Sequence, residues 1–161
     1  MKLALRTLSL CFMFLCSSLV SASEYPLESV FFIEADEMEK LYKIPSKTTH
    51  EAGAALATEK QRASAKTKVG LDEKRAEELA GLFDLMRIKG VGPKMAVLLH
   101  GSGVRCVVHM GREDAGVLLK RVLETNRRLG ITSKLPDTPL LKNWIMQAGK
   151  LKPQFRGKPK N

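Results

Sequence analysis

The sequence predicts an all-α protein, and three features of its pattern support this fold class. Apolar residues recur with the period of an α-helix in several segments, most clearly over residues 73–86 and 140–148. No segment shows the strict alternation that is typical of a half-buried β-strand. Capping residues, glycines and prolines separate the periodic segments at the spacing of short helices. With 161 residues, the chain is long enough for one domain or two very small ones.

The first 23 residues are typical of an export signal. Lys2 and Arg6 precede an apolar core over residues 8–20, which is shorter than the roughly 20 residues that a transmembrane helix usually needs. Small residues follow and allow cleavage after Ala22 or after Ser23. We expect a signal peptide over 1–23 and export of the remaining chain to the periplasm or the medium. The alternative is an N-terminal anchor that is not cleaved. No later segment is long and apolar enough to span a membrane.

Charge and cysteine content limit the possible functions of the mature chain. Removing Lys2 and Arg6 lowers the net charge from +10 to about +8, which favours anionic partners such as nucleic acid or acidic surfaces. Of the three cysteines only Cys106 lies outside the leader, so no internal disulfide is possible. Cys106 lies in an apolar run and is expected in the core.

The first half of the mature chain is predicted to hold four helices. A bend and a helix are expected over 30–43, with these apolar anchors: Ile33, Met38, Leu41 and Tyr42. Residues 45–49 end that helix, and shorter helices follow over 50–57 and 58–68. Asp72 is expected to cap a strong amphipathic helix over 73–86.

Four more helical segments are predicted after residue 92. One helix covers 93–100 and ends at Gly101-Ser102-Gly103. Residues 104–110 could form a strand because of their β-branched residues, but a one-turn helix fits their surroundings better. Asp114 or Glu113 begins a helix that ends near 129, before Gly130. Asp137 or Thr138 caps the last helix, with this predicted buried face: Leu140, Leu141, Trp144, Ile145 and Ala148.

Between the helices over 73–86 and 93–100, residues 87–94 form a basic, glycine-containing turn. Gly90 and Gly92 admit the positive φ angle of a tight turn, and Pro93 suits the first position of a helix. Amide groups at such a helix N-terminus form an anion site, and cationic side chains flank them here. This stretch resembles a helix-hairpin-helix motif, which implies contact with a DNA phosphate. The candidate binding residues are Arg87, Lys89, Gly90, Val91, Gly92 and Lys94.

A wider resemblance covers residues 25–152. Residues 83–93, followed by Leu98-Leu99 and Gly103-Val104, resemble a tandem helix-hairpin-helix domain, the domain of unknown function family 4332. Tyr25-Pro26-Leu27-Glu28 and the segment from Trp144 to Ala148 agree with that family. The resemblance implies a fold but no settled activity. We expect one compact domain over 24–152, with a degenerate repeat at about 25–71, an intact hairpin repeat at about 72–152, and a basic disordered tail over 153–161.

A spacing of 58 residues relates the two expected repeats, because residues 30–35 align with 88–93 and Leu41 aligns with Leu99. The first repeat lacks the family's glycines and has Phe32-Ile33-Glu34-Ala35 in their place. Four carboxylates follow or belong to this stretch: Glu34, Asp36, Glu37 and Glu39. They complement the helix dipole but repel a phosphate, so the first hairpin is expected to be structural.

The favoured function is weak, sequence-independent binding of double-stranded DNA through residues 90–94, with an affinity of roughly 10⁻⁴ to 10⁻⁶ M at physiological salt. Further cations on the helix over 114–129 are secondary candidates: Lys120, Arg121, Arg127 and Arg128. The alternative is a protein-interaction or scaffolding module with a purely structural hairpin. A more distant one is an accessory that delivers nucleic acid to an enzyme. No dinucleotide fingerprint, metal-ligand spacing or catalytic arrangement is present, so no cofactor, metal or catalysis is expected.

Overall fold

The computed structural model describes residues 24–155, and these residues fold as helices joined by short loops. A 3-10 helix, η1 (Leu27–Ser29), comes first. The α-helices are α1 (Ala35–Lys43), α2 (Thr49–Ala55), α3 (Glu59–Val69), α4 (Glu73–Leu85), α5 (Pro93–Gly101), α6 (Val107–Met110), α7 (Ala115–Leu129) and α8 (Thr138–Lys150). Apart from one isolated bridge between Pro26 and Thr48, residues 24–155 contain no β-structure. The predicted all-α class is confirmed.

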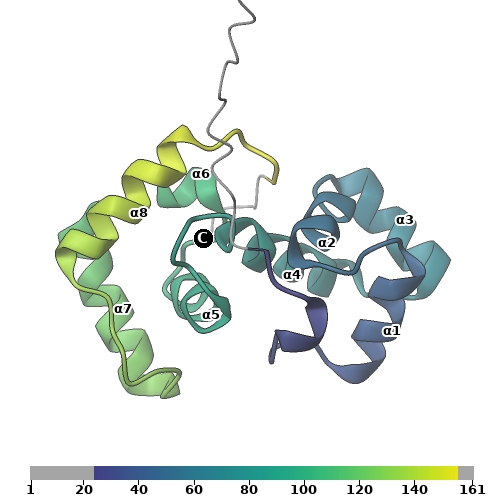
Figure 1. Cartoon of the computed structure of the whole chain (residues 1–161), viewed down its shortest axis with the longest axis horizontal. Helices are drawn as coiled ribbons and strands as arrows, with labels where there is room; N and C mark the ends of the chain where they lie inside the picture. Colours follow the sequence, from purple (N-terminus) through teal and green to yellow (C-terminus); the bar gives the residue numbers. More distant parts are fainter. Residues whose placement is uncertain (1–23, 156–161) are drawn as a thin grey trace, which may run out of the picture.

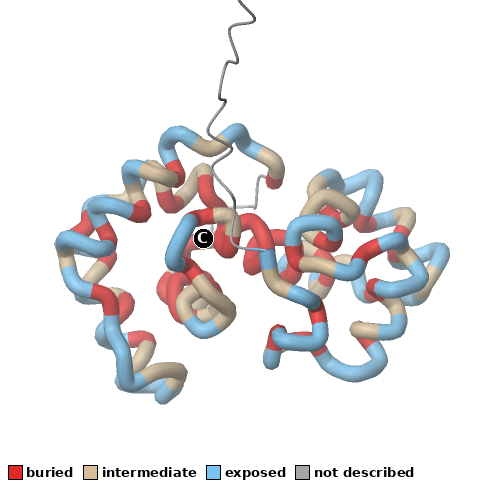
Figure 2. Tube along the Cα trace, in the orientation of Figure 1, coloured by how far each residue is buried: buried red, intermediate tan, exposed pale blue. Residues whose placement is uncertain are grey.

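Helix α4 lies at the centre of the domain. Figure 1 shows α1, α2 and α3 on one side of α4 and α5 to α8 on the other. Helix α4 packs against α2 and α3, and also against α5 and α6. All its residues from Leu79 to Leu85 are buried, and Figure 2 shows buried positions concentrated there. The sequence predicts an amphipathic helix, but the second half of α4 has no solvent-facing side because neighbours cover it all round.

The predicted helix boundaries agree with the structure because local capping sets them. The side chains of Asp72, Asp114 and Asp137 each accept a hydrogen bond from an amide in the first turn of the next helix. Gly130 ends α7 with a φ angle of +61°. Residues 107–110 form the one-turn helix α6, and Cys106 is fully buried before it.

Three predictions about side chains differ from the structure. Tyr42 is 42% exposed, since its hydroxyl bonds Glu28 instead of entering the core. Leu140 is 39% exposed, because α8 turns Leu141, Trp144 and Ala148 inward while Ile145 is half-buried. Phe155 belongs to the predicted disordered tail but is 2% exposed, with its ring 5.2 Å below the guanidinium carbon of Arg62.

The predictions for residues 1–23 and 156–161, which include the signal peptide and its cleavage site, lie outside the described residues. No helix between residues 24 and 155 combines the length and the apolar character needed to cross a membrane.

Candidate nucleic-acid interface

The turn between α4 and α5 is anchored by two apolar side chains. Ile88 and Val91 are fully buried, and the Val91 amide donates to the Ile88 carbonyl at 2.9 Å. Gly90 has a φ angle of +92°, which favours glycine. Gly92 is the extended N-cap of α5, and Pro93 occupies its first turn. The buried pair therefore fixes the turn in the core and leaves its tip at the surface.

Unpaired amide groups gather at this tip. The amides of Gly90, Gly92 and Lys94 donate no hydrogen bond to another residue in the part of the chain that the structure describes. Lys89, Gly90 and Lys94 are exposed. A helix N-terminus carries a partial positive charge, and no carboxylate occurs in the sequence between Asp84 and Glu113. Five of the six predicted residues, 89–92 and 94, thus lie together in one cationic turn whose amides at 90, 92 and 94 are unpaired among residues 24–155.

Helix α8 contacts the turn through Gln147 and Trp144. The amide of Lys89 donates to Oε1 of Gln147 at 3.0 Å, and Nε2 of Gln147 donates to the Lys89 carbonyl at 3.4 Å. Trp144 is 2% exposed, and a methyl group on Gly90 would lie 3.2 Å from its Nε1. This indole N–H has no hydrogen-bond partner among residues 24–155. The indole nitrogen therefore lies beside the turn with no acceptor among these residues.

The sixth predicted residue, Arg87, has a different role. Its Nη1 donates to Oδ1 of Asp84 at 2.6 Å, and its Nη2 donates to the Lys152 carbonyl at 3.0 Å. Oδ2 of Asp84 accepts from the Val107 amide at the start of α6, at 2.9 Å. Burial raises the pKa of the Asp84 carboxyl, and the bonds from Val107 and Arg87 oppose that rise. Arg87 therefore ties α4 to the segment after α8.

The secondary basic candidates lie away from the turn. Lys120 and Arg121 line a groove of about 930 Å³ together with residues 101–103, at the opposite end of α5. Arg121 is paired with Glu113, and Nη2 of Arg127 lies 2.9 Å from Oε1 of Glu124. Arg128 is exposed on the same helix. The structure does not bring these cations together with residues 89–94.

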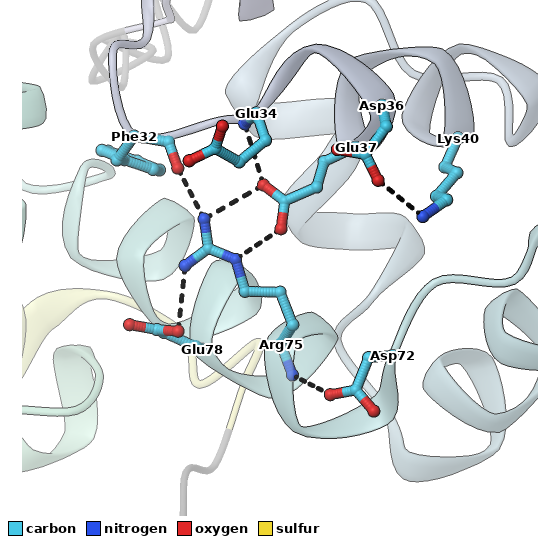
Figure 3. Close-up of polar contacts among 8 residues, drawn as sticks. All are labelled: Phe32, Glu34, Asp36, Glu37, Lys40, Asp72, Arg75 and Glu78. Carbon is cyan, nitrogen blue, oxygen red and sulfur yellow. Dashed lines mark hydrogen bonds and ion pairs between the residues drawn. The ribbon is translucent and has the colours of Figure 1, made fainter.

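The turn before α1 is hydrogen-bonded to a carboxylate of that helix, Glu37 (Figure 3). Oε2 of Glu37 accepts from the Glu34 amide at 2.9 Å, at the N-terminus of α1. Arg75 of α4 donates to both Glu37 oxygens, at 2.7 and 3.0 Å, and also to the Phe32 carbonyl. Burial alone would raise the pKa of Glu37, but the bonds from Arg75 and Glu34 hold that pKa below its ordinary value. The bond to Glu37 in turn raises the pKa of Arg75, and a bond from Arg75 to Glu78 adds to that rise.

The model of DUF4332, a domain of unknown function, matches residues 32–151. The chain belongs to this family. No curated protein and no solved structure matches the chain significantly. The family assignment confirms the predicted membership of family 4332.

Sequence reasoning missed several residues around the DUF4332 turn. Gln147 and Trp144 are 57 and 54 positions from Gly90, and Tyr25 lies beside Gly92 from the other end of the domain. Trp144 is predicted as a core residue and is one, but nothing in its spacing indicates that its N–H faces the turn. Long-range packing places all three, so no local signal in a single sequence identifies them.

Proposed function

We propose that this DUF4332 protein is an exported, non-catalytic tandem helix-hairpin-helix protein that binds the phosphate backbone of duplex DNA through residues 89–94. The observation that carries the proposal is the turn leading into α5, where the amides of Gly90, Gly92 and Lys94 have no hydrogen-bond acceptor among residues 24–155 and the side chains of Lys89 and Lys94 are exposed. Backbone contacts of this kind read no bases, so the binding is sequence-independent and salt-sensitive.

The helix boundaries support the tandem arrangement. Helices α1 and α5 each have nine residues, and Pro93 follows Ala35 by the same 58 positions that relate the two halves of the sequence. Helix α6 begins 58 positions after α2, at Val107 and Thr49. The paired apolar anchors Ile33 and Val91 are both buried. Each repeat thus has a buried anchor, a turn, a nine-residue helix and a second short helix.

The contrast between the two turns supports binding at only one of them. At α1, the Glu37 carboxylate already accepts from an amide of the turn and from Arg75. It occupies the place that a phosphate would take and adds negative charge. At α5, the equivalent amides have no acceptor within the described residues 24–155. One hairpin contacts few phosphates, so we expect weak affinity, roughly 10⁻⁴ to 10⁻⁶ M at physiological salt.

A titration with a fluorescein-labelled duplex tests the proposal through anisotropy at several salt concentrations. The variant is Lys89→Glu with Lys94→Glu, and the matched control is Lys60→Glu with Lys68→Glu, which makes the same charge change at exposed positions of α3. We expect the hairpin variant to lose most affinity and its log K against log salt slope to flatten by about 2. Equal losses in both variants, or none in the hairpin variant, would contradict the proposal.

The second candidate is a protein-interaction or scaffolding module. It is favoured by large exposed apolar side chains on α7, α8 and the loop between them: Val117, Leu123, Leu129, Leu135, Leu140 and Met146. If the parent protein fails to bind duplex DNA even at low salt, this function replaces DNA binding as the better account of the fold.

A further inference from the structure

Tyr25 reaches the start of α5 from the opposite end of the domain. Its amide donates to Oγ1 of Thr49 at 3.3 Å, and its carbonyl accepts from the Thr49 amide at 2.9 Å. These two hydrogen bonds hold Tyr25 against the first turn of α2, and its ring packs against the core. A methyl group on Gly92 would lie 3.2 Å from the Tyr25 hydroxyl oxygen. The hydroxyl therefore lies directly beside the N-cap of α5.

The Tyr25 hydroxyl is without a hydrogen-bond partner in the described part of the chain. It makes no hydrogen bond with residues 24–155, whereas the hydroxyl of Tyr42, the other tyrosine, bonds Glu28. A phenolic O–H is a common donor to phosphate oxygens. Tyr25 thus presents a free donor next to the free amides of Gly92 and Lys94.

Trp144 gives a second, independent indication that this turn receives an anion. The residue is 98% buried, yet its Nε1 has no hydrogen-bond partner among residues 24–155 and lies close to Gly90. A buried donor without an acceptor is unfavourable in the free protein. Its dipole becomes favourable when negative charge lies above Gly90, because the low local dielectric strengthens the interaction.

We infer that the Tyr25 hydroxyl donates a hydrogen bond to the same DNA phosphate that the α5 amides bind. The inference rests on the proposed function and adds a contact residue from outside the hairpin. The site then has neutral donors on two sides: the amides of Gly92 and Lys94 from α5, and the hydroxyl from the N-terminal segment. Lys89 and Lys94 supply the charge.

The experiment compares Tyr25→Phe with Tyr42→Phe in the duplex titration. Tyr25→Phe removes only the hydroxyl and keeps the ring, so the melting temperature should stay that of the parent. We expect a roughly five- to tenfold loss of affinity. The salt slope should stay unchanged, because no cation is removed. Tyr42→Phe makes the same chemical change and should bind like the parent. Titrations are run at a temperature where circular dichroism shows every variant fully folded.

The outcomes separate the inference from the proposal on which it rests. If Tyr25→Phe binds like the parent while the Lys89, Lys94 variant binds weakly with a flatter slope, the hairpin proposal stands and the role of Tyr25 is refuted. Equal losses in both tyrosine variants also refute it. If the parent does not bind, or if the lysine variant binds like the parent, the proposed function fails and the role of Tyr25 fails with it.

Discussion

Replacing Asp84 with alanine should destabilise the domain more than any change at an exposed ion pair. Asp84 is 2% exposed and bonds both the Val107 amide and the Arg87 guanidinium, whose side chain is only 14% exposed. Asp84→Ala leaves both donors without their acceptor.

The magnitude follows from these two losses. An unpaired buried amide costs about 1–3 kcal/mol, and breaking a buried ion pair from one side costs about 3–5 kcal/mol. The two costs overlap. Burial also raises the pKa of the Asp84 carboxyl, because its negative charge is unfavourable there. Removing this buried charge by substitution therefore recovers part of the lost free energy of unfolding. We therefore expect a loss of about 3 kcal/mol. Asp84→Asn keeps an acceptor for Val107 and should cost about 1–2 kcal/mol.

Urea unfolding followed by circular dichroism measures the effect. With a slope of about 2–3 kcal/mol per molar urea, Asp84→Ala lowers the midpoint by about 1 M. The control is Arg127→Ala, which breaks a pair whose side chains are 79% and 62% exposed and should leave the midpoint unchanged. If Asp84→Ala shifts the midpoint no more than Arg127→Ala does, the structural role assigned to Asp84 and Arg87 is wrong.

Two further predictions concern the first half of the domain and its contact with the end of the chain. Phe155→Ala removes a side chain that is 2% exposed and should lower the free energy of unfolding by about 3 kcal/mol. The same urea assay measures this loss. A change as small as that of Arg127→Ala would place Phe155 outside the core. The pKa of Glu37 lies below its ordinary value of 4.5, so its carboxylate stabilises the fold above that pH. The stabilisation is lost as the pH falls through the lowered pKa. Thermal melts from pH 6 to pH 3 should therefore fall more steeply for the parent than for Glu37→Gln, and parallel curves would contradict this.

Local chemistry made much of the fold predictable. Caps such as Asp72 and Asp137, and the glycine that ends α7, determine helix ends through contacts within a few residues. The turn over 88–93 is also local, since two buried apolar residues and two glycines specify it. The sequence therefore predicted the helix order and the exposed tip of the turn.

Other features depend on contacts between distant residues. Arg87 was predicted as a phosphate ligand because it adjoins the turn, but Asp84 and the Lys152 carbonyl hold its guanidinium. The polar composition around Phe155 predicts disorder, although its ring is buried beside Gly81 of α4 and below the Arg62 guanidinium of α3. Tyr25 and Gln147 reach the turn only through tertiary packing. A single sequence contains no periodicity that reports such pairings.

The supports of the α5 turn come from both ends of the domain, Tyr25 before α1 and Gln147 within α8. During synthesis, residues 89–94 leave the ribosome more than 50 residues before Gln147 does. A nascent or truncated chain that ends before α8 thus holds Tyr25 and all the lysines and glycines of the turn, but it lacks Gln147, whose side chain bonds the backbone of Lys89. The bonds between Gln147 and the backbone of Lys89 therefore form only when the last helix docks, which makes them a reporter of completed folding.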